Sequence, residues 1–231
     1  MAVHRLDLIE RSETLTAQVA EKLREALTGG VFAPGDKITI RAVAKSLGVS
    51  LTPAREALSI LAAEGALEFG ANRTLMVPPL SVDRLAEITR IRIALEGLAA
   101  ERAARLLEDR EIARIVAANE AMIRATEAED FKGAIQHNHE FHFGIYRGSR
   151  MPTLIKMIEG LWLRTGAYVN LIYPAFGLAR KGIENHERAA RALKARDADG
   201  LRAAIEFDIR YSAEHLEAEL RAKQPEALKL A

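Results

Sequence analysis

The chain of 231 residues contains no cysteine and no long apolar segment. Without cysteine, it has neither a disulfide framework nor a thiolate metal site. No apolar run approaches the ~20 residues that a membrane-spanning helix needs. The N-terminal residues also lack the apolar core of an export signal. We therefore expect a cytoplasmic protein with no membrane partner.

Residues 39–58 are typical of two short helices joined by a tight turn. Thr39 can cap the first helix, and Gly48 stands where a left-handed C-terminal stop is favourable. Thr52 directly precedes Pro53, and this pair predicts the cap and the first position of the second helix. The segment is therefore a candidate helix-turn-helix.

The polar side chains of this segment point away from its apolar face. In a helix-turn-helix, the start of the second helix approaches base edges, where an arginine can bind guanine with two hydrogen bonds. We expect Arg55 to make that contact, while Arg41 and Lys45 contact phosphates. The candidate DNA-contacting residues here are Arg41, Lys45, Ser50, Thr52, Arg55 and Ser59. Bundles use similar helix pairs for packing, so this segment alone leaves that alternative open.

The flanking residues favour a winged helix-turn-helix. Upstream, apolar residues recur at helical spacing and stop at Gly29-Gly30, which predicts a third helix. Downstream, residues 66–69 and 75–77 are strand-like runs around a polar turn, which predicts a hairpin. Asn72 and Arg73 at its tip can reach the minor groove or its phosphates, or form only a solvated turn.

These residues resemble the DNA-binding domain of the GntR family of bacterial transcription regulators, over about residues 14–77. The most specific match is Leu47-Gly-Val-Ser-Leu-Thr-Pro-Ala-Arg-Glu-Ala-Leu58, followed by Glu64-Gly65. The family often has arginine where this chain has Leu51, and commonly has glycine where it has Thr74. The resemblance implies a transcription regulator that has lost one DNA contact.

Overall charge does not explain how such a domain would bind DNA. The chain has a net charge of +1, and residues 1–78 contain nine basic and nine acidic side chains. Local placement of the charges must therefore guide binding. A weakly charged monomer would bind poorly, so we expect a homodimer that reads the two half-sites of a short palindromic operator.

Pro78-Pro79 ends the wing and divides the chain into residues 1–78 and residues 79–231. From Ser81 to about Leu220 the pattern is helical and predicts six helices in an antiparallel bundle. The breaks fall near residues 108–109, 128–130, 148–152, 175–177 and 197–200. The expected fold is mainly α, with an N-terminal winged helix-turn-helix domain followed by an all-α effector and dimerisation domain.

An arginine falls in the apolar row of the first bundle helix. Leu85, Ile88 and Ala99 share one face, and Arg92 lies on the same face. An unpaired buried charge is costly, so Arg92 needs an anionic partner. That partner is either Glu96 one turn on, in a structural salt bridge, or the carboxylate of a bound effector.

Three later helices also carry polar residues on inward faces. Asn138 and His142 are one turn apart, His186 lies in a later apolar stripe, and Asp208 follows on the next helix. Lone histidines in such stripes are more often hydrogen-bonded core residues than metal ligands. Two histidines with a carboxylate and an amide make a metal site an equal alternative.

Residues 81–220 resemble the FCD domain, the all-helical effector domain of one GntR subgroup. The resemblance is carried by Arg92-x-x-Leu-Glu96, Phe141-His142, Glu187 beside His186, and Asp197. It implies a divalent metal, Zn, Ni, Mn or Fe, held by Asn138, His142, His186 and Asp208, the last in place of the family's histidine. His215, two turns beyond Asp208, is a possible substitute ligand.

The expected function is a DNA-binding transcription regulator, a repressor rather than an activator. A small organic acid would bridge the metal and Arg92 and change the spacing of the two DNA-binding domains. One alternative is a regulator for which the metal ion itself is the effector. Another is a metal-dependent enzyme acting on a small hydroxy acid, but nothing beyond the metal ligands supplies a general base. We therefore do not expect an enzyme.

Overall fold

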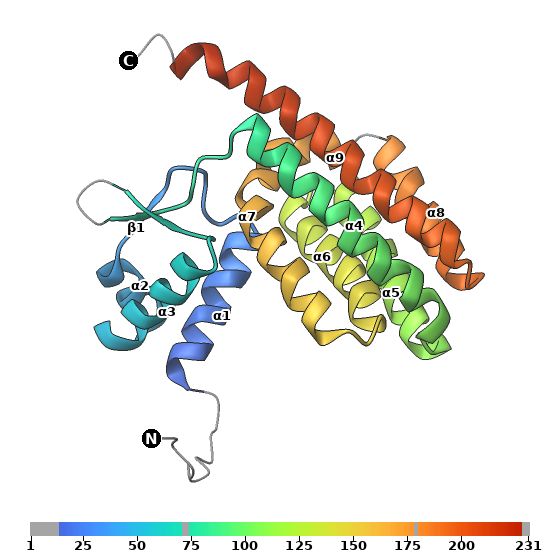
Figure 1. Ribbon diagram of the computed structural model, residues 1–231, viewed down its shortest axis with the longest axis horizontal. Coiled ribbons are helices and arrows are strands. Elements are labelled where there is room, and N and C mark those ends of the chain that lie inside the picture. The colour runs from blue at the N-terminus through green and yellow to red at the C-terminus, as the bar shows by residue number, and fades with distance from the viewer. Residues whose placement is uncertain (1–13, 71–73, 178–179, 228–231) are drawn as a thin grey trace, which may run out of the picture.

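The computed structural model describes residues 14–70, 74–177 and 180–227, and it is mainly helical (Figure 1). The elements of the N-terminal part are α1 Leu15–Thr28, β1 Lys37–Ile38, α2 Ile40–Leu47, α3 Leu51–Ala63, β2 Glu68–Phe69 and β3 Leu75–Met76. They are followed by α4 Val82–Leu106, α5 Asp109–Glu127, α6 Phe131–Gly148, α7 Pro152–Gly177, α8 Arg180–Lys194 and α9 Ala198–Ala227. Within these ranges, no helix is both long and apolar enough to cross a membrane.

The predicted helix pair is α2 and α3. The Thr39 side chain caps α2 by accepting a hydrogen bond from the backbone N–H of Ala42 at 3.2 Å, and Gly48 ends it with φ +66°. The start of the next helix was predicted wrongly, because α3 begins at Leu51 and Pro53 is its third residue. Proline is tolerated there since the first N–H groups of a helix have no partner within it.

The predicted wing is confirmed as an antiparallel pair of β2 and β3, with Phe69 opposite Leu75. The strand β1 pairs with the other edge of β3, which gives the order β1-β3-β2. This strand was not predicted, because a two-residue strand is too short to show alternation. The predicted tip residues, Asn72 and Arg73, lie outside the described residues.

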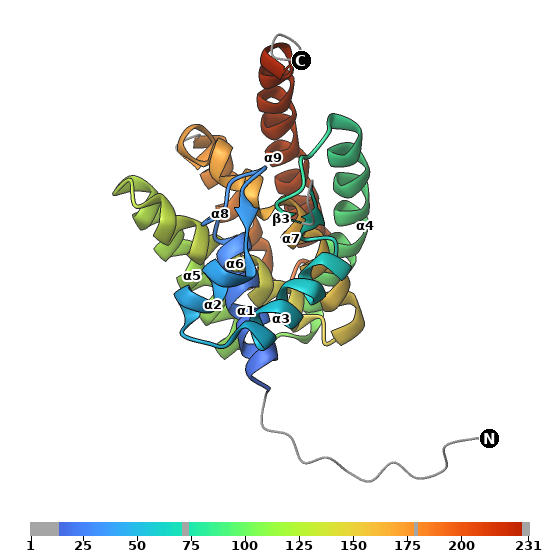
Figure 2. The ribbon, with the colours of Figure 1, turned by 90° about the vertical axis from the view of Figure 1, so that its left-hand side faces the viewer.

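The six helices α4–α9 form the bundle, and four of the predicted breaks lie near the junctions between them. The break predicted at residues 175–177 was wrong, because α7 continues through these residues to Gly177. In Figures 1 and 2, α4 and α9 run side by side, and the last turns of α9 extend beyond the other helices. Their close approach depends on small residues, since a Cβ added at Gly97 would lie 3.0 Å from the Glu206 side chain. Phe141, Phe143 and Tyr146 of α6 fill the core beside them.

Helix α7 joins the bundle to the winged unit. Leu163, Ala167 and Tyr168 of α7 are buried in the same apolar cluster as the helices of that unit. Arg164 donates a hydrogen bond to the backbone carbonyl of Glu64 at 3.1 Å. The hydroxyl of Tyr168 is hydrogen-bonded to the backbone that leaves the wing, at residues 78 and 80. Helix α7 therefore contacts the winged unit directly and helps to hold it on the bundle.

Candidate metal and effector site

The predicted DNA-contacting side chains that the structure describes lie on α2, on the turn after it and on the first turns of α3. All six are exposed: Arg41, Lys45, Ser50, Thr52, Arg55 and Ser59. The hydroxyl of Ser59 donates to the backbone carbonyl of Arg55 at 2.9 Å. Arg55 is the only cationic side chain of α3. Leu51, where the family often has arginine, is 47% exposed beside it.

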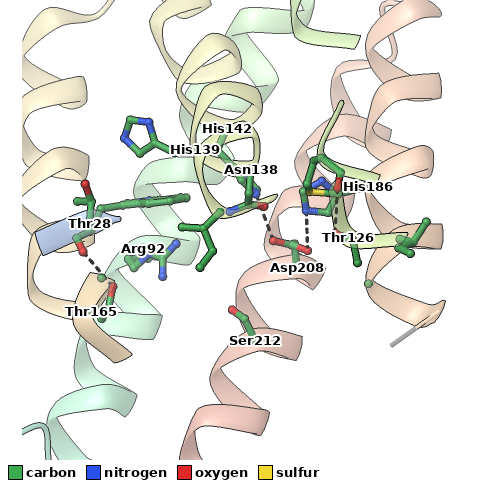
Figure 3. Close-up of a pocket in the computed structure, with 16 residues that line it drawn as sticks. Thr28, Arg92, Thr126, Asn138, His139, His142, Thr165, His186, Asp208 and Ser212 are labelled. Atoms are coloured by element: carbon green, nitrogen blue, oxygen red, sulfur yellow. Dashed lines mark hydrogen bonds and ion pairs between the residues drawn. The ribbon is translucent and has the colours of Figure 1, made fainter. Parts of the chain in front are cut away.

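A small cavity lies inside the bundle, with a volume of about 70 Å³ (Figure 3). Since a water molecule needs roughly 10–15 Å³ by this measure, the cavity has room for a small ligand of only a few non-hydrogen atoms. Its polar lining comes from several helices: Thr28, Arg92, Thr126, Asn138, His139, His142, Thr165, His186, Asp208 and Ser212. The cavity brings together Arg92 and all four predicted metal ligands.

His142, His186 and Asp208 form a group that can hold a metal ion. The Nε2 atoms of His142 and His186 lie 3.4 Å and 3.5 Å from the two oxygens of the Asp208 carboxylate. All three ligand atoms lie within 4.8 Å of one another. Neighbouring donors of a tetrahedral site lie about 3.4 Å apart when each is about 2.1 Å from the ion. The two nitrogen–oxygen separations are long for hydrogen bonds and are compatible with such a site, with each histidine facing a different oxygen of the carboxylate.

The other ring nitrogen of each histidine is occupied by a hydrogen bond. Nδ1 of His142 lies 3.1 Å from the hydroxyl of Tyr146, which donates its own proton to Glu96 and therefore accepts from the imidazole. Nδ1 of His186 lies 3.1 Å from the side-chain oxygen of Asn119, which can only accept. In its neutral form, each histidine would therefore carry its proton on Nδ1 and direct the lone pair of Nε2 towards Asp208. Metal-binding histidines are usually oriented in this way.

The protonation states also suit a cation. Burial lowers the pKa of His142, which favours the neutral imidazole at pH 7. Burial alone would raise the pKa of Asp208, but His186 and His142, when their rings are protonated, lower that pKa through their charge and their hydrogen bonds to the carboxylate. A neutral imidazole and an ionised carboxylate are the forms that bind metal ions.

Arg92 forms the predicted salt bridge with Glu96, and it also lines the cavity. Its Nε donates to Glu96 at 2.6 Å, and its guanidinium lies 4.9 Å from the centre of the Trp162 ring. Glu96 is fully buried and accepts further hydrogen bonds from Tyr146 and from the indole of Trp162. Burial acts to lower the pKa of Arg92, but Glu96 outweighs it, so the pKa is raised and the guanidinium stays charged.

The two remaining predicted ligands differ in their placement. Asn138 lines the cavity one turn before His142, as Figure 3 shows. His215 does not line the cavity; its Nδ1 lies 2.8 Å from the backbone carbonyl of Tyr211. The seven residues that separate it from Asp208 place it about 10 Å farther along α9. The structure therefore does not bring His215 into the cluster.

The prediction from sequence missed several residues of the site. Tyr146 could have been found, because it follows His142 by four residues and so lies on the same helix face. Asn119 and Trp162 come from α5 and α7, and their local sequence gives no sign of a site. Asn185 also contributes, since its side-chain amide donates to Asp208 at 3.3 Å.

Comparison with known proteins agrees with both halves of the structure. Residues 15–77 match the gntR family of bacterial regulatory proteins, and residues 87–218 match the FCD domain. Over 191 residues the chain is 37% identical to the HTH-type transcriptional regulator McbR of Escherichia coli K12, covering 82% of this chain and 86% of McbR. It is 27% identical to the probable D-xylose utilization operon transcriptional repressor of Paenarthrobacter nicotinovorans, covering 80% of each protein.

Solved structures show the same arrangement. E. coli McbR/YncC matches with a TM-score of 0.84 and 34% identity, over 90% of this chain and 99% of that one. A putative GntR regulator from Rhodococcus sp. RHA1 has a TM-score of 0.69 at 20% identity, over 90% of this chain and 97% of that one, and shares the fold. The chain is therefore a DNA-binding transcription regulator rather than an enzyme, and it belongs to the GntR family, with an FCD domain behind its DNA-binding domain.

Proposed function

We propose that the chain is a homodimeric repressor, acting in the cytoplasm, whose affinity for a short palindromic operator is controlled by a small carboxylate. The effector binds beside a divalent metal ion in the bundle. The observation that carries this proposal is the cluster of His142, His186 and Asp208 in a cavity that Arg92 also lines. The metal would supply a positive charge that anchors the carboxylate.

The cluster suits a divalent ion through its chemistry as well as its spacing. The two imidazole nitrogens are borderline donors and the carboxylate is a hard one, and the side-chain oxygen of Asn138 can add a fourth, also hard, donor. This set accommodates Zn, Ni, Mn or Fe. The hydrogen bonds that the imidazoles donate to Tyr146 and Asn119 keep each ring in the orientation that metal binding requires.

A count of buried charges favours an effector with one negative charge. Arg92 and Glu96 neutralise each other, and Asp208 contributes one negative charge. A divalent ion would leave the site with one positive charge, which a monocarboxylate would balance. Since uncompensated buried charge is costly, the site should prefer a monocarboxylate to a dicarboxylate. The Nη1 group of Arg92 would donate to it, because Nε and Nη2 are directed at Glu96.

The repressor and dimer assignments have separate support. One relative bears the name of a transcriptional repressor, that of the Paenarthrobacter D-xylose utilization operon. The balanced charge of the DNA-binding half favours two copies that bind two half-sites together, since each copy supplies few phosphate contacts.

The single tryptophan provides a direct test of metal binding. Trp162 is the only tryptophan of the chain, and its ring centre lies 5.4 Å from that of His142. Paramagnetic Ni²⁺ bound at the cluster should quench its fluorescence, with saturation at one ion per chain. Asp208→Asn should weaken Ni²⁺ binding at least about tenfold, because an ionised ligand is lost. His215→Ala, a histidine outside the cluster, should bind as the unchanged chain does. Equal loss in both variants would contradict the assignment.

Arg92→Lys tests the carboxylate contact while keeping the positive charge. Lysine has a single nitrogen and cannot hold Glu96 and donate to the acid from separate, fixed positions as Nε, Nη2 and Nη1 of arginine do, so affinity for the effector acid should fall about tenfold. The acid is first identified by a thermal-shift screen of small monocarboxylates on Zn²⁺-loaded protein. An Arg92→Lys chain that the acid stabilises as strongly as the unchanged chain would reject this role. Operator affinity without acid serves as the control and should not change.

A further inference from the structure

The winged unit itself reaches the cavity. Thr28, the last residue of α1, lines the cavity together with bundle residues. In Figure 3, Thr28 lies at the left of the drawn side chains, and Arg92 lies between it and the pair of Asp208 and His186. A ligand that extends from the metal cluster past Arg92 would therefore meet a residue of the DNA-binding half.

At this point α1 rests directly on α7. A Cβ added at Gly166 would lie 2.8 Å from the Cα of Thr28 and 2.9 Å from the carbonyl oxygen of Leu27. Gly166 also lines the cavity, so one position serves both the cavity wall and the helix contact. Because the nearest atoms are backbone, α1 cannot adjust to a larger group by rotating a side chain and must move.

Helix α1 also contacts α3, the helix that carries Arg55. The hydroxyl of Thr16 donates to Glu56 of α3 at 2.7 Å. The guanidinium of Arg24 binds Glu64 directly after α3, with its Nε at 3.1 Å from the carboxylate. One contact lies in the middle of α3, next to Arg55, and the other lies directly after its last residue, so a displacement of α1 would reorient the face that carries Arg55.

A second cavity, of about 440 Å³, lies between α1 and helices α6 and α7. It shares Thr28, His139 and Trp162 with the cavity that holds the metal cluster. The same three side chains therefore separate the inner cavity from the cleft beneath the winged unit.

We propose that Thr28 is an effector-contacting residue, so that the DNA-binding half forms one wall of the effector cavity. An effector that fills this end presses on α1 and shifts α3 through the contacts of Thr16 and Arg24. This inference rests on the proposed effector function of the cavity. It adds that the signal passes through a direct contact at Thr28 and Gly166.

The absence of cysteine allows the contact to be filled covalently. Thr28→Cys introduces the only thiol of the chain, and methyl methanethiosulfonate adds a methylthio group to it. Affinity is measured for an operator selected in vitro from random DNA. Labelling should change this affinity at least tenfold, which lies within the usual range for two coupled sites. Ala17→Cys, on an exposed position of the same helix, should give no change when labelled. An unchanged affinity for labelled Thr28→Cys would overturn the proposal.

Gly166→Ala tests the same contact without labelling. The added methyl group should displace α1 and change operator affinity at least tenfold in the same direction as labelling at position 28. Gly160→Ala is the matched control, because it lies on the same helix and its added Cβ would meet nothing within 4 Å. If Gly166→Ala and Gly160→Ala had the same operator affinity, the contact between α1 and α7 at Gly166 would not carry the signal. These measurements need no metal, so failure of the Ni²⁺ titration would refute the metal site separately.

Discussion

Replacing Glu96 with alanine should lower the free energy of unfolding by about 3–5 kcal/mol, the usual cost of removing one partner of a buried ion pair. Glu96 is fully buried and accepts hydrogen bonds from Arg92, Tyr146 and Trp162. Its removal leaves the Arg92 charge without its partner and two buried donors without an acceptor. Urea denaturation at pH 7, followed by circular dichroism, measures the change.

Two further variants show whether the loss arises from burial of the charge. Glu206→Ala removes a partly buried carboxylate that binds Arg202 and Arg210 along α9, and it should cost less than about 1 kcal/mol because both guanidinium groups are exposed and stay solvated. Glu96→Gln keeps a hydrogen-bond acceptor and should fall between the two alanine variants. If Glu96→Ala and Glu206→Ala were equally stable, Glu96 would not be the centre of the network.

Arg55→Ala should lower operator affinity about 100-fold. A two-pronged arginine–guanine contact contributes about 1–3 kcal/mol, and a dimer would lose it in both half-sites. The exposed position of Arg55 on the first turns of α3 makes it the side chain best placed for this contact. Fluorescence anisotropy with the selected operator and with unrelated DNA measures the loss.

Lys45→Ala provides the comparison, because loss of a phosphate contact should weaken binding to both DNAs alike. It should also lower the slope of log affinity against log salt concentration by about two, one for each half-site. Arg55→Ala should instead reduce the preference for the operator. Tight and sequence-specific binding by Arg55→Ala would show that another residue reads the bases. That result would concern only the role of Arg55 and would not bear on the fold of the winged unit.

The winged unit could be predicted from sequence because its signals are local. Thr39, Gly48 and the apolar spacing of α2 and α3 each act within a few residues. The same dependence on local signals explains the error at Pro53, since proline fits any position in the first helical turn. It also explains why β1 was missed, because Lys37–Ile38 is a strand only through pairing with β3.

The candidate site was predictable only in part. Helical spacing and the FCD resemblance predicted His142, His186 and Asp208 as site residues, and the structure places these three together. The sequence left open whether Arg92 forms a salt bridge with Glu96 or lies in the ligand site. In the structure it forms the salt bridge and also lines the cavity. Thr28 could not be predicted, because its place in the cavity depends on how α1 packs against α7, far away in the sequence.

The most direct test of acid and metal control is operator affinity measured with Zn²⁺ and with the monocarboxylate found in the thermal-shift screen. We predict that the acid changes the affinity of the Zn²⁺-loaded chain at least fivefold. The change should disappear with a chelator and in Asp208→Asn. If the acid left operator affinity unchanged, the cavity would not be an effector site. If the acid response persisted without metal and in Asp208→Asn, the effector would not bind through the metal.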